Sequence, residues 1–200
     1  MLRPVCSPTV ATIDAHMSVV RSIVLALALI GGACSASAPS APQTEVPVAS
    51  SSFVLTSTAF PEGGAIPREF SCDGENVSPP LSWSGAPAEA QTMALIVDDP
   101  DARGFVHWVV YNVDPSATGE LARGVSASPD APSQGRNGFG NVGYGGPCPP
   151  SGSHRYVFRL LALDTTLSLG GGPGATDVLA AAEGHILAEA RLTATYRRGS

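Results

Sequence analysis

The segment Thr92–Val97, with the sequence TMALIV, constrains the fold more than any other part of the chain. A strand with one face in water alternates apolar and polar side chains, whereas a strand covered on both faces is apolar nearly throughout. This segment follows the second pattern. We therefore expect it to form a strand that is buried on both faces.

Other segments also have strand character, and loops rich in glycine and proline separate them, since the chain holds 22 Gly and 18 Pro. Two of these segments concentrate the β-branched and aromatic residues that favour strands, and the other two are short or alternate only weakly. The expected strands, with the one above, are Phe53–Thr58, Leu81–Trp83, Thr92–Val97, Val106–Val113 and Arg155–Leu163.

The last part of the chain predicts one helix followed by one strand. Thr176 is the expected N-cap, and Asp177 favours the positive end of the helix. The apolar residues that follow at helical spacing are Val178, Leu179, Ala182 and Ile186. The segment Ala188–Tyr196 then alternates apolar and polar residues, as a strand does. The predicted fold class is therefore mostly β with a short, late helix.

Residues 1–34 have the layout of a secretory signal segment. Arg21 precedes the apolar run Ile23–Ile30, and small residues then lead to Cys34. The run is too short to span a bilayer, which needs roughly 20 apolar residues. The ending resembles the lipobox of bacterial lipoproteins, so we expect lipidation of Cys34, with an ordinary cleaved signal peptide as the alternative. Met17 offers a second start, which would remove residues 1–16, and both alternatives imply export.

Residues 35–52 are mostly Ser, Ala, Pro and Thr, a composition that predicts a flexible linker. Residues 53–197 are long enough for one domain with its own core. After Cys34 the chain has nine arginines, no lysine and sixteen acidic residues, a net charge of −7. Without a basic stripe the chain is not expected to bind nucleic acid, and membrane contact is expected only through the lipid anchor.

Two cysteines, Cys72 and Cys148, fall within the expected domain. In an exported protein such a pair is more often a disulfide than two free thiols, so we expect them to be joined. A zinc site built from both cysteines with His107 and His154 is the alternative. The close pair of ligands that usually marks structural zinc is missing, so we expect no metal.

Three carboxylates crowd around Pro100, directly before the strand that contains His107. Like charges so close raise one another's pKa unless positive or hydrogen-bonding groups compensate. We expect Asp99 to point inward, because alternation cannot bring all three side chains inside. Asp98 and Asp101 are expected to cap turns and face water.

A second histidine, His154, opens another expected strand and is followed by Arg155 and Tyr156. A histidine at the start of a strand is by default a half-buried residue with one satisfied nitrogen. Here, two imidazoles, a tyrosine hydroxyl and one carboxylate can converge on a loop rich in glycine and proline. Such a set favours a small anion or a polar head group, because each of these groups can hydrogen-bond it.

A hydrolase is the competing interpretation. No serine stands in a Gly-x-Ser-x-Gly frame, and Gly152-Ser153-His154 lacks it. An Asp/His pair, such as Asp99 with His107, could act as acid and base, but the sequence nominates no nucleophile. We therefore expect no enzyme activity and no cofactor, and keep the Asp/His hydrolase as the alternative.

Several motifs of this chain, in their order, resemble the phosphatidylethanolamine-binding protein (PEBP) family, and specifically its bacterial Raf-kinase-inhibitor-like branch. The motifs are SCDGENVSPPLSW (Ser71–Trp83), DDPDA (Asp98–Ala102), HWVVYN (His107–Asn112), GRNGFG (Gly135–Gly140) and GYGGPCPPSGSHRYVF (Gly143–Phe158). The resemblance covers essentially all of the expected domain.

This resemblance implies a β-sandwich of antiparallel sheets with a short C-terminal helix and a small anion-binding pocket. The pocket residues that carry over are Asp99, His107, Gly146, Pro147, His154 and Tyr156. The family's usual role is binding and regulation, with lipid head groups, kinases and proteases as partners. We therefore expect an exported binding or regulatory protein that holds phosphate or a phospholipid head group and modulates a partner enzyme, with a hydrolase or a protease-inhibitor module as alternatives.

The chain departs from the family pattern at two places. Arg103 and Gly104 form a short bridge to Phe105, where the family commonly has a proline and a longer insert. The bridge is expected to shorten one pocket wall and to leave Arg103 either near the entrance or in solvent. In GRNGFG, Gly138 stands where relatives often carry Asp. Both departures bear on which ligand fits.

Overall fold

The computed structural model describes residues 52–115 and 119–199. The expected signal segment, the lipidation site at Cys34 and the linker up to residue 51 lie outside the described residues. Among the residues described, no helix has the length and apolar character needed to cross a membrane.

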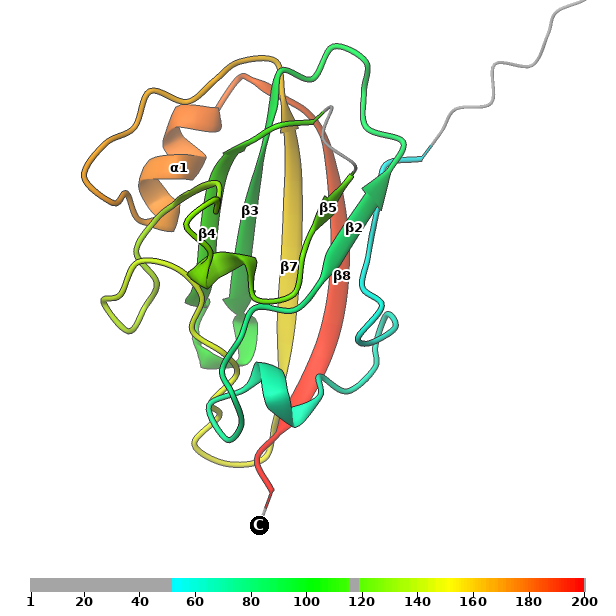
Figure 1. The fold of residues 1–200 in the computed structure, drawn as a ribbon, viewed down its shortest axis with the longest axis vertical. Coiled ribbons are helices and arrows are strands. Elements are labelled where there is room, and N and C mark those ends of the chain that lie inside the picture. The colour runs from blue at the N-terminus through cyan, green and yellow to red at the C-terminus, as the bar shows by residue number, and fades with distance from the viewer. Residues whose placement is uncertain (1–51, 116–118, 200) are drawn as a thin grey trace, which may run out of the picture. The chain divides into compact units, whose positions relative to one another are not determined.

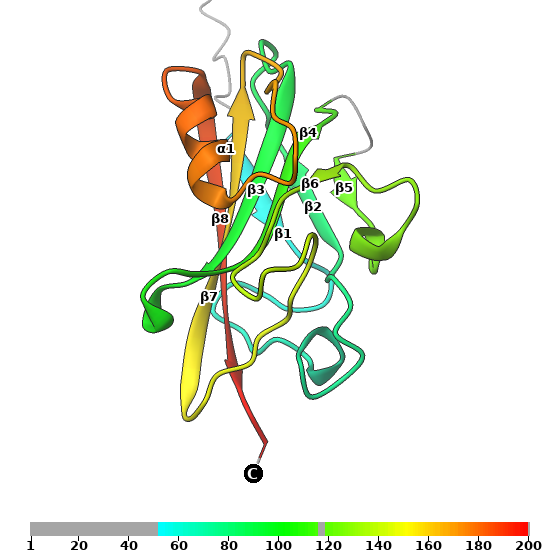
Figure 2. The ribbon, with the colours of Figure 1, turned by 90° about the vertical axis from the view of Figure 1, so that its left-hand side faces the viewer.

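The described residues form two sheets. The larger has five strands in the order β6-β4-β3-β7-β8, and every neighbouring pair is antiparallel (Figure 1, Figure 2). Its strands are β3 (Thr92–Asp99), β4 (Phe105–Val113), β6 (Ser133–Gln134), β7 (Ser153–Leu163) and β8 (Ile186–Arg197). The apolar segment singled out in the sequence is thus the middle strand of this sheet.

The smaller sheet has three antiparallel strands in the order β1-β2-β5 and packs against one face of the larger sheet. Its strands are β1 (Val54–Thr56), β2 (Leu81–Ser84) and β5 (Glu120–Leu121). Buried side chains of both sheets form the main core, among them Leu81 and Trp83 from β2 and Leu95, Trp108 and Phe158 from the larger sheet. The described residues therefore form the β-sandwich that the family resemblance implied.

The helix α1 (Ala175–Ala182) covers the opposite face of the larger sheet (Figure 2). Val178 and Ala182 of the helix are buried there against a second core that includes Ala94 and Ile96 of β3. Neighbouring side chains of β3 point to the main core on the other face. This arrangement confirms that β3 is buried on both faces.

The expected helix begins and ends differently from the prediction. Gly174, not Thr176, is the N-cap, and its N–H donates to Asp177 Oδ2 at 2.9 Å. Ile186 belongs to β8 instead of the helix. The helix ends before Gly184, whose φ of +80° lies in the left-handed region that glycine tolerates best. A local turn thus interrupts the helical spacing of apolar residues.

The remaining strand predictions hold with small shifts at the ends. On β8, residues 190, 192, 194 and 196 are buried and alternate with more exposed neighbours, as the sequence indicated. β5 and β6 have only two residues each, too short to produce a periodic signal. Within the described part of the chain, three single-turn 3-10 helices lie in the loops: η1 (Arg68–Phe70), η2 (Pro100–Ala102) and η3 (Val125–Ala127).

Candidate functional site

Antiparallel pairing brings two loop-to-strand junctions together at one end of the larger sheet (Figure 1, Figure 2). The first junction, Asp98–Phe105, joins β3 to β4, and the second junction, Cys148–Arg155, leads into β7. Asp98 lies opposite Val157 of β7, so the end of β3 and the start of β7 are neighbours. The helix α1 lies at the other end of the sheet.

The first junction is a tight turn built on η2. Asp99 caps it, because its Oδ1 accepts the Ala102 N–H at 3.0 Å, and Pro100 opens the turn. Arg103 and Gly104 both have positive φ, at 58° and 75°, which reverses the chain within two residues. Arg103 is exposed and makes no ion pair with any described residue, so it lies in solvent.

Asp99 is buried, with 2% of its surface exposed, as the sequence predicted. Its Oδ2 lies 2.7 Å from His154 Nδ1. Because an ionised carboxylate can only accept, Nδ1 carries the proton and donates. Asp99 therefore links the two junctions and fixes the orientation of the His154 ring.

The other two carboxylates have different roles. Asp101 is exposed and binds Arg155 through its backbone N–H at 2.8 Å and its guanidinium at 2.6 Å. The Arg155 side chain holds the pKa of Asp101 at about 2. Asp98 was expected to face water, but it is half-buried and lies 3.6 Å from Arg159 Nε. The reason is that Asp98 belongs to β3 itself, beside the paired strand β7.

His107 is buried among aromatic rings. Its ring centroid lies 5.2 Å from that of Phe105, 5.6 Å from that of Phe139 and 5.1 Å from that of Tyr156. Burial lowers the pKa of His107, so the ring is neutral at pH 7. Nδ1 lies 2.7 Å from the Gly145 carbonyl oxygen and donates to it, which leaves the lone pair on Nε2 available as an acceptor.

The Tyr156 side chain packs edge-on against His107, and its residue is 1% exposed. Its hydroxyl oxygen is buried near the Asp99 side chain and the Cys148 backbone, but no described residue makes a hydrogen bond of normal geometry with it. Burial raises the pKa of Tyr156, and the Asp99 carboxylate raises it further, so the hydroxyl stays protonated. A buried donor without a partner is costly, which makes this hydroxyl a candidate for contact with a ligand.

A cavity of about 170 Å³ opens between the two junctions and is here called the anion cavity, after the ligand expected from the sequence. Its walls are formed by Asp99, Ala102, Phe105, His107, Phe139, Cys148, Pro149 and Pro150. Of the six pocket residues expected from the sequence, Asp99 and His107 line it directly. His154 and Tyr156 contact those two residues from behind.

Gly146 and Pro147 do not line the anion cavity. The Gly146 N–H donates to Asn76 Oδ1 at 2.7 Å, and the Pro147 carbonyl accepts the Cys72 N–H at 3.1 Å. A Cβ on Gly146 would lie 2.4 Å from the Phe70 carbonyl oxygen, so only glycine fits. Both residues fasten the second junction to the segment that follows η1.

The walls that the sequence interpretation missed are mainly Phe105, Phe139 and the pair Pro149-Pro150. Phe139 is 49% exposed although it is a large apolar residue, a signal of function that only the structure provides. Gly138 explains how Phe105 fits, since a Cβ there would lie 2.6 Å from the Phe105 ring. The two departures from the family pattern therefore meet in one place.

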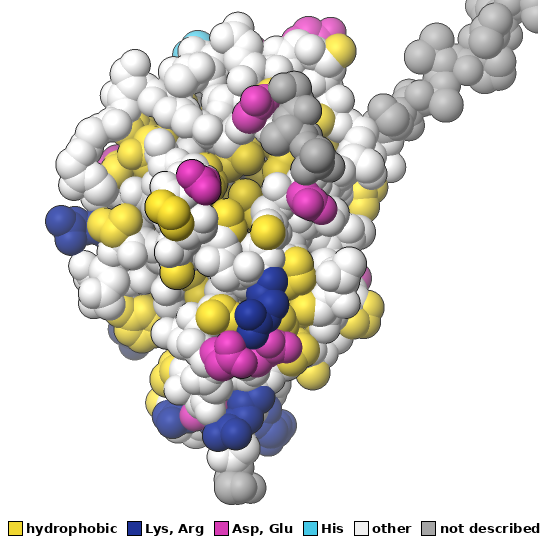
Figure 3. Space-filling view, viewed as in Figure 1, with side chains coloured by type: hydrophobic (Ala, Val, Ile, Leu, Met, Phe, Trp, Pro, Cys, Tyr) yellow, Lys and Arg dark blue, Asp and Glu magenta, His cyan; other side chains and the backbone are white. Residues whose placement is uncertain are grey.

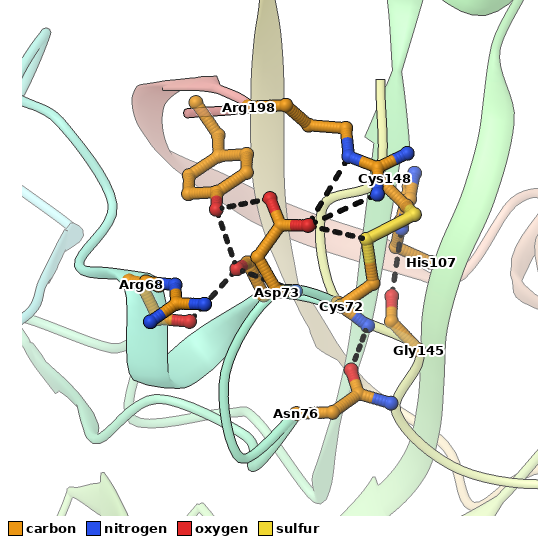
Figure 4. The surroundings of a disulfide bond; sticks show 11 residues. Arg68, Cys72, Asp73, Asn76, His107, Gly145, Cys148 and Arg198 are labelled. Carbon is orange, nitrogen blue, oxygen red and sulfur yellow. Dashed lines mark hydrogen bonds and ion pairs between the residues drawn. A yellow bond between two sulfur atoms is a disulfide. The ribbon is translucent and has the colours of Figure 1, made fainter. Parts of the chain in front are cut away.

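The structure joins Cys72 and Cys148 by a disulfide that closes a separation of 76 residues (Figure 4). The bond lies beside Asn76, Gly145 and His107. Because the disulfide uses both thiols, the zinc set considered from the sequence is not formed. The described part of the chain contains no cluster of three or more His, Cys, Asp or Glu residues that could hold a metal ion.

Arginines gather toward the end of the domain where the chain terminates, beside carboxylates (Figure 3). Arg123 pairs with Glu69 at 2.7 Å and Glu75 at 2.9 Å, and Arg198 pairs with Asp73 at 3.1 Å. These acids offset much of the positive charge near this end. Neither Arg123 nor Arg198 lines the anion cavity.

The family model described as phosphatidylethanolamine-binding protein matches residues 56–197. A UPF0098 protein of Methanothermobacter thermautotrophicus is 54% identical over 149 residues, which are 72% of this chain and 99% of that protein. A UPF0098 protein of Chlamydia muridarum is 44% identical over 151 residues, which are 72% of this chain and 98% of that protein.

Two solved structures resemble the fold. A homologue of phosphatidylethanolamine-binding protein from Chlamydia trachomatis superimposes with a TM-score of 0.70 at 43% identity, covering 75% of this chain and all of that one. Escherichia coli YbcL, described as a member of the mammalian PEBP family, gives a TM-score of 0.68 at 31% identity, covering 74% of this chain and 99% of its own.

Proposed function

The chain belongs to the phosphatidylethanolamine-binding protein family, and on that premise we propose that it is an exported binding protein whose anion cavity holds a small oxyanion. The oxyanion is a phosphate or the phosphate of a head group. The observation that carries the proposal is the buried His107, which lines this cavity, donates its Nδ1–H to the Gly145 carbonyl and keeps Nε2 without a hydrogen-bond partner among the described residues.

The hydrogen-bonding groups around the anion cavity specify the ligand further. Nε2 of neutral His107, on the cavity wall, is an acceptor, and the Tyr156 hydroxyl behind that wall is a donor. Asp99 repels a fully ionised group, although its two oxygens are already engaged by Ala102 and His154. The best fit is an oxyanion that also carries a donor, such as hydrogen phosphate or the amine-bearing head group phosphoethanolamine.

Isothermal titration with inorganic phosphate and with phosphoethanolamine tests this proposal. The wild-type protein should bind at least one of them saturably, and His107→Ala should weaken binding by about tenfold or more, the usual worth of a hydrogen bond to a charged group. His185→Ala is a matched control, because His185 also pairs with a carboxylate, Asp164 at 2.8 Å, but follows α1. No saturable binding by the wild-type protein would refute the proposal.

We also infer that the site binds without turnover. Of the described residues that line the anion cavity, Cys148 is in the disulfide and the remainder offer no hydroxyl or thiol as a nucleophile. The hydrolase alternative is tested with phosphate and carboxylate ester substrates. Turnover that disappears in Asp99→Asn would replace the binding role by an enzymatic one.

Export is supported by the disulfide, because such bonds persist mainly in oxidising compartments. Mass spectrometry of the mature protein from a membrane fraction tests it. A lipid on Cys34 at the amino terminus is the expected result. An intact, unmodified amino terminus would remove both the lipid anchor and the signal segment from the proposal.

A further inference from the structure

A second hollow, of about 270 Å³, lies directly beside the anion cavity and is here called the amide hollow. Its walls are Cys72, Asn76, Asn137, Phe139, Asn141, Tyr144, Gly145, Gly146 and Cys148. Phe139 and Cys148 line both spaces. A ligand held in the anion cavity can therefore extend past the Phe139 ring into the amide hollow.

The sizes of the two spaces favour such an extended ligand. The anion cavity alone is smaller than the roughly 300–1,000 Å³ of typical small-molecule sites. The anion cavity and the amide hollow together fall within that range. The oxyanion accounts for the smaller space and leaves the larger one for the group attached to it.

The amide hollow offers neutral hydrogen-bonding groups. None of the described residues that line it has a charged side chain. Asn76 uses its Oδ1 for the Gly146 N–H, which leaves its NH₂ group free of any partner among the described residues. The Asn141 carboxamide is exposed and makes no hydrogen bond to a described residue. Each of these amide groups can bind a hydroxyl.

Asn137 makes this surface rigid. Its Oδ1 accepts the N–H groups of Phe139 at 3.0 Å and Asn141 at 3.2 Å, and its NH₂ donates to the Gly143 carbonyl at 2.9 Å. The backbones of Phe139 and Asn141 are thereby held in place before a ligand arrives. Such preorganisation lowers the cost of binding.

An extended peptide is a poor match for the amide hollow, because its main chain needs free backbone partners. Four N–H groups along this wall are already used. Gly145 donates to the His107 carbonyl, Gly146 donates to Asn76, and both Phe139 and Asn141 donate to Asn137. A ring that carries hydroxyls needs only the side-chain amides.

Phe139 supplies an apolar surface for such a ring. It is 49% exposed, and the Phe105 ring supports it at a centroid distance of 4.8 Å. Its ring also packs on Gly145, where a Cβ would lie 2.6 Å from the Phe139 ring. Supported on two sides, Phe139 presents a fixed aromatic surface between the two spaces, against which the C–H groups of a sugar can pack.

We propose that the amide hollow is a second subsite, and that the ligand is a phosphorylated sugar whose phosphate occupies the anion cavity and whose hydroxylated ring binds Phe139 and Asn141. The inference rests on the proposed oxyanion site and adds the chemical class of the ligand. This phosphate with a hydroxylated ring can be a free sugar phosphate or the inositol phosphate head group of a lipid.

Titration with glucose 1-phosphate and inorganic phosphate tests the subsite. Glucose 1-phosphate should bind about tenfold or more tightly than phosphate, because the ring adds hydrogen bonds and aromatic contact. Asn141→Ala should weaken glucose 1-phosphate binding by about three- to tenfold and leave phosphate binding unchanged. Val142→Ala, which changes the adjacent exposed residue outside the amide hollow, is the control and should leave both affinities unchanged.

The outcomes separate the two proposals. If phosphate does not bind, the oxyanion site fails, and the subsite fails with it. If phosphate binds but glucose 1-phosphate binds no more tightly, or Asn141→Ala does not discriminate between them, the subsite alone is overturned. Sedimentation with phosphatidylcholine vesicles with and without phosphatidylinositol then identifies the source. Co-sedimentation that requires phosphatidylinositol indicates the lipid, and its absence indicates the free sugar phosphate.

Discussion

Two acid–base pairs connect the same two junctions. Their acidic residues lie two positions apart in the first junction, and their basic residues are adjacent in the second, yet the surroundings of the two pairs differ. The inner pair, Asp99 with His154, spans 2.7 Å, and its side chains are 3% and 15% exposed. The outer pair, Asp101 with Arg155, spans 2.6 Å, but its side chains are 32% and 59% exposed. Similar distances therefore occur at very different degrees of burial.

The difference in burial decides what each pair can do. Water and salt screen the outer pair, so it contributes little to stability despite its short contact. The inner pair is largely removed from water, so loss of one partner leaves a buried group uncompensated. The inner pair also borders the anion cavity. The pair expected to contribute more to stability, Asp99 with His154, is thus also the pair next to the proposed ligand site.

The largest effect is expected for the disulfide, a covalent link that holds the second junction independently of both pairs. Replacing Cys72 and Cys148 together by serine removes a cross-link across 76 residues and should lower the free energy of unfolding by about 4 kcal/mol. Urea denaturation measures the loss, and the wild-type protein with reductant should match the double variant. A loss below about 1 kcal/mol would mean that the pairs and backbone contacts suffice.

The next largest effect on stability is expected at His154, and it is compared with that at the neighbouring Arg155. His154→Ala leaves the Asp99 carboxylate buried without its imidazole and should cost about 3 kcal/mol in urea denaturation. Arg155→Ala, one residue away, exposes Asp101 further to water and should leave the urea midpoint nearly unchanged. Equal losses in the two variants would contradict the distinction between inner and outer pairs.

The smallest effect is a dependence of stability on pH. It distinguishes the buried His107 from the exposed Asp101 by the pH range in which each loses its contribution. His107 has a lowered pKa when folded, so the unfolded chain binds more protons below about pH 6.5, and stability should fall from that pH downward. Asp101 has its pKa lowered from 3.8 to about 2, so its contribution is present above pH 4 and is lost as pH falls toward 2.

Urea midpoints measured from pH 7.5 to pH 2.5 check both windows. His107→Gln should remove the loss that begins near pH 6.5 and keep the one below pH 4. Asp101→Asn should keep the loss that begins near pH 6.5 and make the one below pH 4 slightly smaller, because Asp73 also has a lowered pKa and contributes to that window. If His107→Gln declines in parallel with the wild-type protein between pH 6.5 and 5, another group is responsible for that window.

Features that depend on local pattern were determined by the sequence itself. The composition of TMALIV predicted burial of β3 on both faces, because successive side chains of a strand point to opposite faces and nearly all of these are apolar. Crowding and alternation likewise predicted which carboxylate points inward, and Asp99 is the buried one. The helix was predicted, but its first residue was not, because Thr176 and Gly174 are both plausible caps and local spacing does not choose between them.

Only the tertiary structure decided which residues form the walls of the site. The prolines that line the anion cavity are Pro149 and Pro150, whereas Gly146 and Pro147 fasten the same loop to the segment after η1. A loop's position is set by its partners in the fold, here Cys72 and Asn76, about 70 residues away in sequence. Phe139 became a shared wall for the same reason. Spacing along the chain carries no information on such distant contacts.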